Sequence, residues 1–309
     1  MKAPESKSGS VEITGAAAVV VRRFAESGSA DVPDAVAIEE PLEIQIVYGA
    51  RDARHAKSIS ITMRTPGNDA ELAVGFLLTE GVIRDADEIE SIALGSFDSD
   101  KMGNDGLAAQ RQGILRTRRS EPNTVTLELL PQVKVSTAAL QRNFYTTSSC
   151  GVCGKASLLA LHTVCPPRAA NTFTIVADTV HRMPAILRVS QGVFQQTGGL
   201  HAAAVFDCHG VLDLMREDVG RHNALDKLIG TAAIADRLPL RDRVLLLSGR
   251  ASFELLQKAV MAGVPMVAAV GAPSSLAIEV AKDFDVTLIG FLREGHFNTY
   301  HGADRILAA

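Results

Sequence analysis

The residues best suited to chemistry are two cysteines, Cys150 and Cys153, in the segment 147–155. Glycines lie next to both, three hydroxyl residues precede them, and an apolar run at 156–161 follows. If that run is helical, Cys150 lies at its amino-terminal end, where unpaired backbone N–H groups and the helix dipole stabilise a thiolate. Lys155 adds a positive charge, which also lowers a thiol pKa. The segment therefore predicts a reactive thiol site.

The Cys-x-x-Cys spacing is also found in thioredoxin-like redox pairs, in zinc half-sites and in inert cysteine pairs. Redox pairs of that type follow the first strand of a small βαβ domain, whereas about 150 residues precede this pair. Zinc would need further ligands such as His162 and Cys165, but a helix over 155–162 would separate its ends by roughly 10 Å. The polar surroundings disfavour an inert pair. Spacing alone leaves redox, metal and sulfur-relay roles open.

Composition limits the class of protein. The chain has 309 residues, enough for two domains with their own cores, and its 47% hydrophobic and 21% charged content is typical of globular proteins. A net charge of −4 and a pI near 6.1 argue against nucleic acid or an anionic membrane as main partner. No apolar run has the length of a bilayer span, and residues 1–10 are too charged for a signal peptide. With only four cysteines, we expect reduced thiols and a cytoplasmic protein.

The first half of the chain predicts a small mixed domain. Runs rich in β-branched residues predict strands, and a helix with an apolar face is expected at 70–80. Residues 26–34 are rich in glycine, serine, aspartate and proline and predict a loop. We expect a tail and edge strand at 1–34, a small N-terminal α+β domain at 35–145, and a Cys-x-x-Cys loop and helix at 146–170. The strands are expected at 16–24, 36–38, 42–47, 58–64 and 124–130.

The second half, residues 171–309, predicts an α/β domain. A helix is expected at 178–191 with a break near Pro184, because proline disfavours the helix interior. Apolar strand patterns then alternate with amphipathic helix patterns, which indicates a sheet covered by helices. Strands are expected at 202–207, 244–248, 266–270 and 287–291, and helices at 222–229, 252–262 and 274–284.

Two glycine-bearing turns in this half follow predicted strands. They are Ser248-Gly249-Arg250 and the turn at 271–275. In open α/β sheets such turns lie at the carboxyl ends of strands, and helix N-termini there bind phosphates. The polar segment 216–223 adds Arg221 and His222. Two such turns beside basic groups favour a polyanionic ligand, while simple helix caps and a salt-bridged surface turn remain the alternatives.

The segment 198–204 invites comparison with the zinc deaminases. Those enzymes carry His-x-Glu followed by Pro-Cys-x-x-Cys, so that three ligands hold zinc and the glutamate moves protons. Here His201 is followed two places later by Ala203, and the Cys-x-x-Cys lies upstream. We therefore expect no deaminase activity and no metal ion held by this protein.

Taken together, these motifs resemble those of the FdhD/NarQ family, sulfur carriers needed for formate dehydrogenase activity. The resemblance extends from about residue 35 onward. It implies a cytidine-deaminase-like three-layer α/β/α domain at 171–309, preceded by the smaller α+β domain, with a mobile Cys-x-x-Cys loop between them. The matching segments are 71–77, 79–81, 150–154, 201–204, 217–222, 224–228, 248–252 and 291–296.

The resemblance also implies a function. Cys150 would accept sulfane sulfur from a cysteine desulfurase as a persulfide, with Cys153 assisting. The sulfur would pass to a molybdenum or tungsten bis-molybdopterin guanine dinucleotide cofactor, bound as a substrate, before its insertion into formate dehydrogenase. Such a protein is a sulfurtransferase-type carrier, and the family resemblance suggests a homodimer. The expected cofactor-binding residues are Arg221, His222, Ser248, Arg250, Phe291, Leu292, Arg293, Glu294, Gly295 and His296. Arg293 stands at a position where the family usually has a lysine, and His296 at one where it usually has an arginine.

Overall fold

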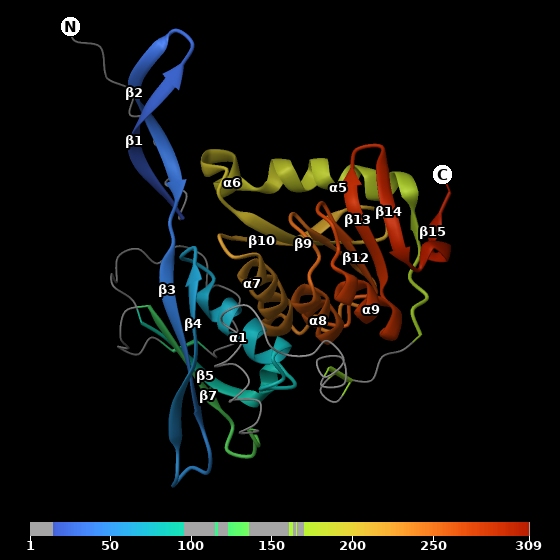
Figure 1. The fold of residues 1–309 in the computed structure, drawn as a ribbon. Coiled ribbons are helices and arrows are strands. Elements are labelled where there is room, and N and C mark those ends of the chain that lie inside the picture. The colour runs from blue at the N-terminus through green and yellow to red at the C-terminus, as the bar shows by residue number, and fades with distance from the viewer. Residues whose placement is uncertain are drawn as a thin grey trace, which may run out of the picture.

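The structure is a computed structural model, and it describes residues 15–95, 115–116, 123–135, 161–162, 165 and 170–308. Helices pack against β-sheets in both halves of the chain (Figure 1). The expected α/β class with an α+β N-terminal part is therefore confirmed. Cys150 and Cys153 lie outside the described residues, so the reactive thiol site stays a prediction.

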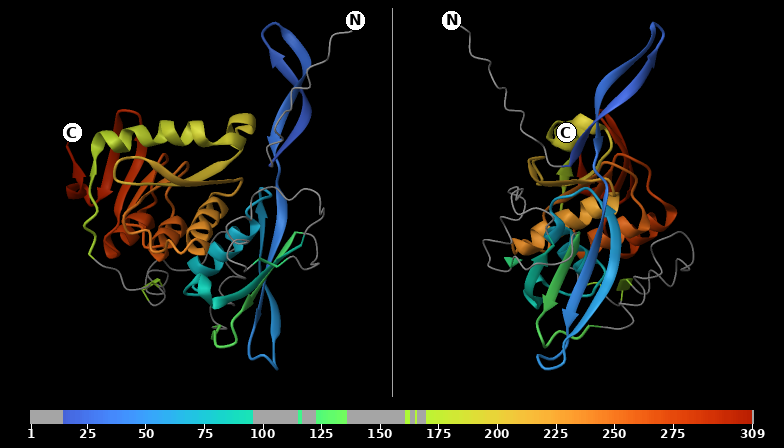
Figure 2. Two further views of the ribbon diagram at one scale, coloured as in Figure 1. Left: turned by 180° about the vertical axis from the view of Figure 1, so that it is seen from behind. Right: turned by 90° about the vertical axis from the view of Figure 1, so that its left-hand side faces the viewer.

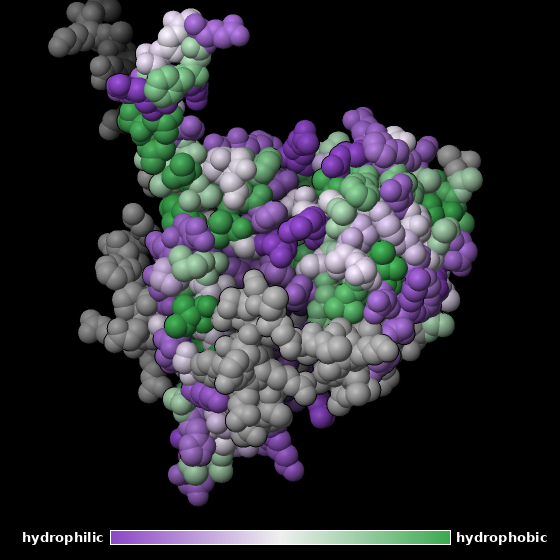
Figure 3. All heavy atoms as spheres, in the orientation of Figure 1, coloured by the Kyte–Doolittle hydropathy of each residue, from purple (hydrophilic) through white to green (hydrophobic). Residues whose placement is uncertain are grey.

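The described chain begins with a long hairpin. Strands β1 (Ala16–Ala25) and β2 (Gly28–Ala37) pair antiparallel from Ala16↔Ala37 to Ala25↔Gly28. The hairpin projects from the rest of the molecule (Figures 1 and 2), and hydrophobic residues lie on its surface (Figure 3). Two of its hydrophobic side chains, Val20 and Phe24, are 74% and 78% exposed. The loop expected at 26–34 is wrong, because most of that segment pairs with β1. Cross-strand pairing overrides the turn-forming composition.

The N-terminal sheet has five strands in the order β4-β3-β7-β5-β6. These are β3 (Glu40–Tyr48), β4 (His55–Arg64), β5 (Ile89–Leu94), β6 (Leu115–Arg116) and β7 (Thr124–Leu129). The helix α1 (Asp69–Thr79) shares a core with this sheet, and the short 3-10 helix η1 (Ala86–Glu88) precedes β5. The helix and three of the strands expected in this half are confirmed here.

The C-terminal sheet has six strands in the order β10-β9-β11-β12-β13-β14. They are β9 (His201–Phe206), β10 (Leu212–Asp218), β11 (Val244–Leu247), β12 (Met266–Ala269), β13 (Thr287–Arg293) and β14 (His296–His301). Strands β11, β12 and β13 are parallel, while β9 and β14 run antiparallel to their neighbours. Since β10 is antiparallel to β9, it runs in the same direction as β11. The carboxyl ends of four strands therefore meet at one edge.

Helices cover both faces of this sheet. Leu245 and Leu247 of β11 join the core formed with α7 (Arg221–Ile234), α8 (Phe253–Met261) and α9 (Ser275–Asp283). Val244 and Leu246, on the other face, pack in the core of α5 (Ala177–Ser190). The short helix α6 (Gly192–Thr197) follows α5. Strand β8 (Ile175–Val176), just before α5, pairs with β15 (Ile306–Leu307) near the end of the chain. The 3-10 helix η3 (Ala303–Arg305) precedes β15. The expected likeness to cytidine deaminases stays a prediction.

Helix α5 continues through Pro184, so the predicted break is wrong. A proline removes one backbone hydrogen bond and favours a kink. Three apolar residues spaced along the helix, Val180, Met183 and Leu187, are nevertheless buried against the sheet. Tertiary packing of this face supplies most of the stability of such a helix.

The two halves meet where α1 and α7 cross. A Cβ atom on Gly230 would lie 1.8 Å from the carbonyl oxygen of Glu71, and one on Gly75 would lie 1.9 Å from that of Asp226. Only glycine permits two backbones to approach this closely. Lys258 of α8 adds a polar contact, donating to Thr79 Oγ1 at 2.9 Å. The N-terminal half is thus fixed directly against the helix that begins at Arg221.

Candidate functional site

A cavity of about 1060 Å³ opens at the edge where the parallel strands end. Ser248 follows β11, Val270 follows β12 and Leu292 lies near the end of β13, and all three line the cavity. Ligands of open α/β sheets bind outside the carboxyl ends of the strands. The volume lies just above the usual range for ligand pockets. This cavity is the candidate site.

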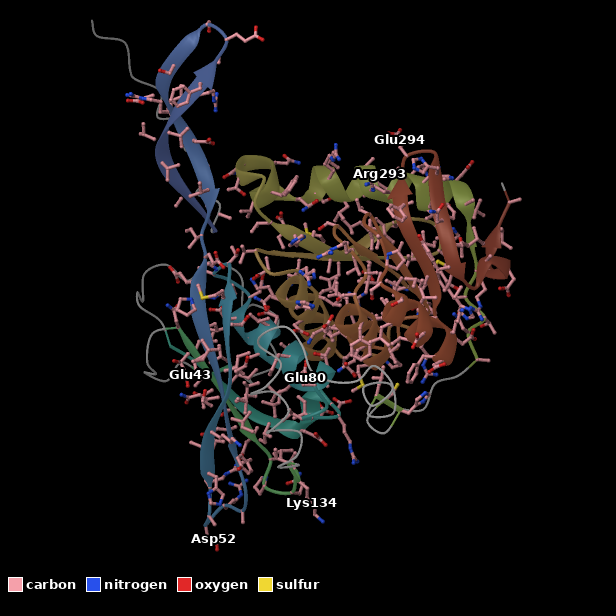
Figure 4. All side chains as sticks on the ribbon, viewed as in Figure 1. Glu43, Asp52, Glu80, Lys134, Arg293 and Glu294 are labelled. Carbon is pink, nitrogen blue, oxygen red and sulfur yellow. The ribbon has the colours of Figure 1, made fainter. Side chains whose placement is uncertain are left out.

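The turn between β13 and β14 forms one wall of the cavity. Arg293 and Glu294 (Figure 4) line it, together with His296 and the buried Leu292. Arg293 Nη1 donates to the carbonyl oxygens of Val270 at 2.5 Å and Leu292 at 2.9 Å. The rest of that guanidinium is exposed at the wall. The structure thus brings four of the six residues predicted at 291–296 to one cavity.

Backbone strain accompanies this wall. Phe291 has a φ of 53° within β13, and its N–H donates to the carbonyl oxygen of Gly271 at 3.0 Å. A left-handed backbone at a bulky residue is costly and persists only where neighbouring contacts enforce it. Here the strand register shifts between Gly290 and Arg293. The shift interrupts the regular pairing of β13 with β14 just before the turn.

The loops after β11 and β12 lie against each other at the same edge. Gly271 N donates to Gly249 O at 2.8 Å, and a Cβ on Gly271 would lie 2.9 Å from Arg250 Cα. The second loop ends at Ser274, whose hydroxyl caps α9 by accepting from Ala277 N at 3.2 Å. Helices α8 and α9 both begin here, so their unpaired N–H groups lie at this edge. Arg250 is exposed but is not one of the cavity-lining residues.

His201 connects the cavity to the start of α7. It lines the cavity, and a Cβ on Gly249 would lie 3.3 Å from its Nδ1. Burial, and then the positive charge of Arg221, lowers the pKa of His201. Burial lowers the pKa of His222 to about 4, with Arg221 adding to the effect. Both imidazoles are therefore neutral at pH 7, and His222 Nε2 lies 3.9 Å from Glu254 Oε2.

A buried polar network fixes the first turn of α7. Asp218 is 0% exposed and accepts from Gly220 N at 2.8 Å and from Thr65 N at 3.1 Å. Asn223 Nδ2 donates to the carbonyl oxygen of Met63 at 2.7 Å. The alternative of a salt-bridged surface turn at 216–223 is wrong, because the N-terminal half covers this segment. That half positions Arg221 and His222 next to His201.

The opposite wall was not predicted from the sequence. It is built by the corner between α5 and α6, where Arg188, Gln191 and Phe194 line the cavity. These residues belong to none of the motifs that carried the family resemblance. Their side chains reach the cavity because α5 packs across the sheet, and helical spacing alone does not show which sheet edge a helix end will approach.

The structure places no metal site in the part of the chain that it describes: no group of three or more His, Cys, Asp or Glu is arranged to hold an ion. Nor is any described helix long and apolar enough to cross a membrane. Of the two cysteines with described positions, Cys165 is half-buried and Cys208 is exposed.

Comparisons with known proteins find relatives that match this chain over most of its length. A protein from Mycolicibacterium paratuberculosis is 50% identical over 278 residues, covering 89% of this chain and 92% of its own. Relatives from Streptomyces coelicolor (45% identity, 93% and 94% covered) and Sulfurisphaera tokodaii (37%, 89% and 92%) also match. All three bear the name "Sulfur carrier protein FdhD".

A crystal structure from Desulfotalea psychrophila, of a candidate formate dehydrogenase accessory protein, has the same fold. Its TM-score is 0.67 at 20% identity, with 95% of this chain and 100% of that chain covered. The model of the FdhD/NarQ family matches residues 37–307. The resemblance inferred from the sequence motifs is confirmed: this chain belongs to the FdhD/NarQ family.

Proposed function

We propose that this protein is a sulfur carrier required for formate dehydrogenase activity, acting in the cytoplasm as a homodimer. Curated relatives with 37–50% identity over most of the chain are named as sulfur carriers. The observation that carries the proposal is the cavity at the carboxyl ends of β11–β13, where Ser248, Arg293 and His296 meet. These residues come from two motifs that lie far apart in the sequence.

The sulfur enters at Cys150. Its thiolate attacks the outer sulfur of a persulfide on a cysteine desulfurase, the sulfur–sulfur bond of that persulfide breaks, and the desulfurase thiolate leaves. Cys150 then carries the persulfide, a reversible cap of an accessible, low-pKa cysteine. The step needs no further oxidant or reductant. Cys153 assists by accepting the sulfur or by resolving the persulfide.

The acceptor is the bis-molybdopterin guanine dinucleotide cofactor, bound as a substrate before its insertion into formate dehydrogenase. Its pyrophosphates need N–H donors and positive charge. Arg293 and His296 in the cavity wall, and the starts of α8 and α9 at the same edge, provide them. The cavity is large enough for a nucleotide portion of such a ligand. The donor set and the size of the site therefore fit this substrate.

The chain length allows Cys150 to approach the acceptor. Leu161, the next residue of described position, is buried in the core of α7–α9, and His162 stacks on Phe284 with ring centroids 4.4 Å apart. Eleven residues of chain span at most about 40 Å. The longest strand of the C-terminal sheet has 7 residues, or roughly 23 Å. The anchor at Leu161 is thus compatible with delivery to the cavity.

Mass spectrometry tests the sulfur-loading step. The reduced protein is incubated with a cysteine desulfurase and cysteine, weighed intact and mapped after digestion. We expect one added sulfur on Cys150, removed by a thiol reductant and absent in Cys150→Ala. The exposed Cys208 offers a matched control, and Cys208→Ala should load normally. Failure to add sulfur, with a stoichiometric zinc ion in the purified protein, would instead support the metal-site alternative.

A further inference from the structure

The hairpin of β1 and β2 leaves apolar side chains in solvent along most of its length. Val20 and Phe24 of β1 and Val36 of β2 are all exposed. The base of the hairpin is anchored, since a Cβ on Gly199 would lie 3.3 Å from the Cβ of Ala37, and the rest projects away (Figures 1 and 2). A two-stranded hairpin is at best marginally stable by itself in water. Its exposed apolar surface therefore indicates a partner that covers it.

The outer edge of β2 is protected against pairing with another strand. Pro33 lies in the middle of β2, opposite Val20 of β1. Prolines within strands occur at sheet edges, where the missing N–H faces away from the neighbouring strand. Asp31 and Asp34 add carboxylates beside this proline. Charged residues and proline are devices that keep an edge strand from pairing, so β2 is not the edge along which the hairpin grows.

The outer edge of β1 lacks such protection. The strand contains no proline, and among the described residues it pairs with β2 alone. Three consecutive valines, at 19–21, lie at its centre. Such β-branched residues fit the pleated surface of a sheet. The two charged residues of the strand, Arg22 and Arg23, lie toward the tip of the hairpin. An additional strand would therefore pair with β1.

The sequence of β1 is complementary to itself in the antiparallel direction. With a two-fold axis at Val20, Arg22 of one copy lies opposite Ala18 of the other. Phe24 likewise lies opposite Ala16, so that large side chains meet small ones. Parallel pairing in register would instead place each arginine opposite its own copy, and like charges directly opposite each other are destabilising. A two-fold dimer uses the same surface on both subunits, so this one edge is sufficient for both copies.

We propose that two copies of this chain associate through their hairpins, with β1 of one copy paired antiparallel to β1 of the other. The result is a sheet in the order β2-β1-β1-β2 that crosses the two-fold axis. The proposal rests on the homodimer of the proposed function and assigns its interface. The family model begins at residue 37, so this interface lies on an element in front of the matched region.

Light scattering coupled to size-exclusion chromatography tests the interface on the full-length protein. Wild type should have about twice the 32.8 kDa mass of the chain. Val20→Lys should be a monomer at the same concentration, because two lysines would face each other at the axis. Val211→Lys is the matched control, since Val211 is another exposed valine, between β9 and β10, and this variant should stay a dimer.

Cysteine cross-linking tests the direction of the paired strands. Val20→Cys places a thiol at the axis, within disulfide reach of the same thiol in the second copy. Mild oxidation should give a covalent dimer, and mass spectrometry of its digest should show the two residue-20 peptides linked. Ser27→Cys, in the turn at the tip of the hairpin, should give no such link. Antiparallel pairing sends the two tips in opposite directions.

The outcomes separate this interface from the function proposed above. A Val20→Lys variant that remains a dimer, or a link at residue 27 in place of residue 20, would overturn the interface and leave the homodimer intact. A monomeric wild type would count against both the interface and the homodimer. Sulfur loading of Cys150 is measured independently of either result, so the carrier function stands or falls on its own experiment.

Discussion

Lys227 of α7 and Asp218 at the end of β10 form a fully buried ion pair, with Nζ and Oδ2 2.7 Å apart and side chains 2% and 0% exposed. Lys227 Nζ also donates to the carbonyl oxygen of Thr65, at 2.7 Å, in the N-terminal half. The pair therefore joins three segments at the point where α7 begins. The pair thereby fixes the first turns of α7, where Arg221 and His222 lie next to His201 but do not line the cavity.

Removing one member of this pair should destabilise the protein strongly. Lys227→Met leaves the Asp218 carboxylate buried without its counter-charge, and we expect a loss of roughly 3–5 kcal/mol in the free energy of unfolding. Urea unfolding followed by circular dichroism measures it. The double variant Asp218→Asn with Lys227→Met removes both charges and should recover part of the loss. A single-variant loss below about 1 kcal/mol would show that the pair does not hold the halves together.

The glycine contact between α1 and α7 gives a second prediction. Gly230→Ala places a Cβ 1.8 Å from the backbone oxygen of Glu71, and the backbone of a packed helix cannot yield cheaply. We expect a loss of at least about 3 kcal/mol in unfolding free energy, above the usual range for overpacking. Gly192→Ala, at the start of α6, meets no atom within 4 Å and should be neutral or slightly stabilising. Equal melting temperatures for the two variants would contradict the close approach of the helices.

Two strands that the sequence did not predict, β10 and β2, depend on tertiary contacts. The alternation of strands and helices was predictable because apolar periodicity is local. Strand β10 was missed because its segment, rich in charged residues, becomes half-buried only beside β9 and beneath the N-terminal half. Strand β2 was missed because its turn-forming residues pair with β1.

The residues of the candidate site also differ in whether the sequence could predict them. The wall at 291–296 was predictable because its residues are contiguous in the sequence. Arg188 was not, because only the packing of α5 on the sheet carries its side chain to the cavity. Cys150 and Cys153 were identified from local chemistry alone, and their roles stay predictions.

The neutral state of His222 predicts a dependence on pH. Burial first, and then Arg221, lowers its pKa from 6.5 to about 4 in the folded protein. The unfolded chain therefore binds more protons below pH 6.5, so the contribution of this group to stability is lost as the pH falls from about 6.5 to 4. Asp226 acts in the opposite direction, because burial raises its pKa to about 6 and the folded state then binds the extra proton.

Because these two groups oppose each other, the effect of His222 must be isolated. Titration of its imidazole by NMR should give a midpoint near 4. The difference in unfolding free energy, wild type minus His222→Gln, should decrease as the pH is lowered from 7 to 5. An imidazole midpoint near 6.5 would show that His222 is solvated and that the start of α7 is more open than described.

Removing the charge of Arg293 should separate sulfur loading from sulfur delivery. Arg293 lies in the cavity wall, whereas the persulfide forms on Cys150, so Arg293→Ala should still accept sulfur from the desulfurase. Formate dehydrogenase matured in cells carrying this variant should have little activity, because the phosphate of the cofactor loses the guanidinium that donates hydrogen bonds to it. Arg250→Ala provides the comparison: Arg250 is exposed and does not line the cavity, so its loss should affect maturation less. If Arg293→Ala matured the dehydrogenase as well as wild type, the cofactor would have to bind elsewhere on the protein. If Arg293→Ala failed to accept sulfur on Cys150, sulfur loading and sulfur delivery would both depend on Arg293, and the separation of the two steps would be wrong.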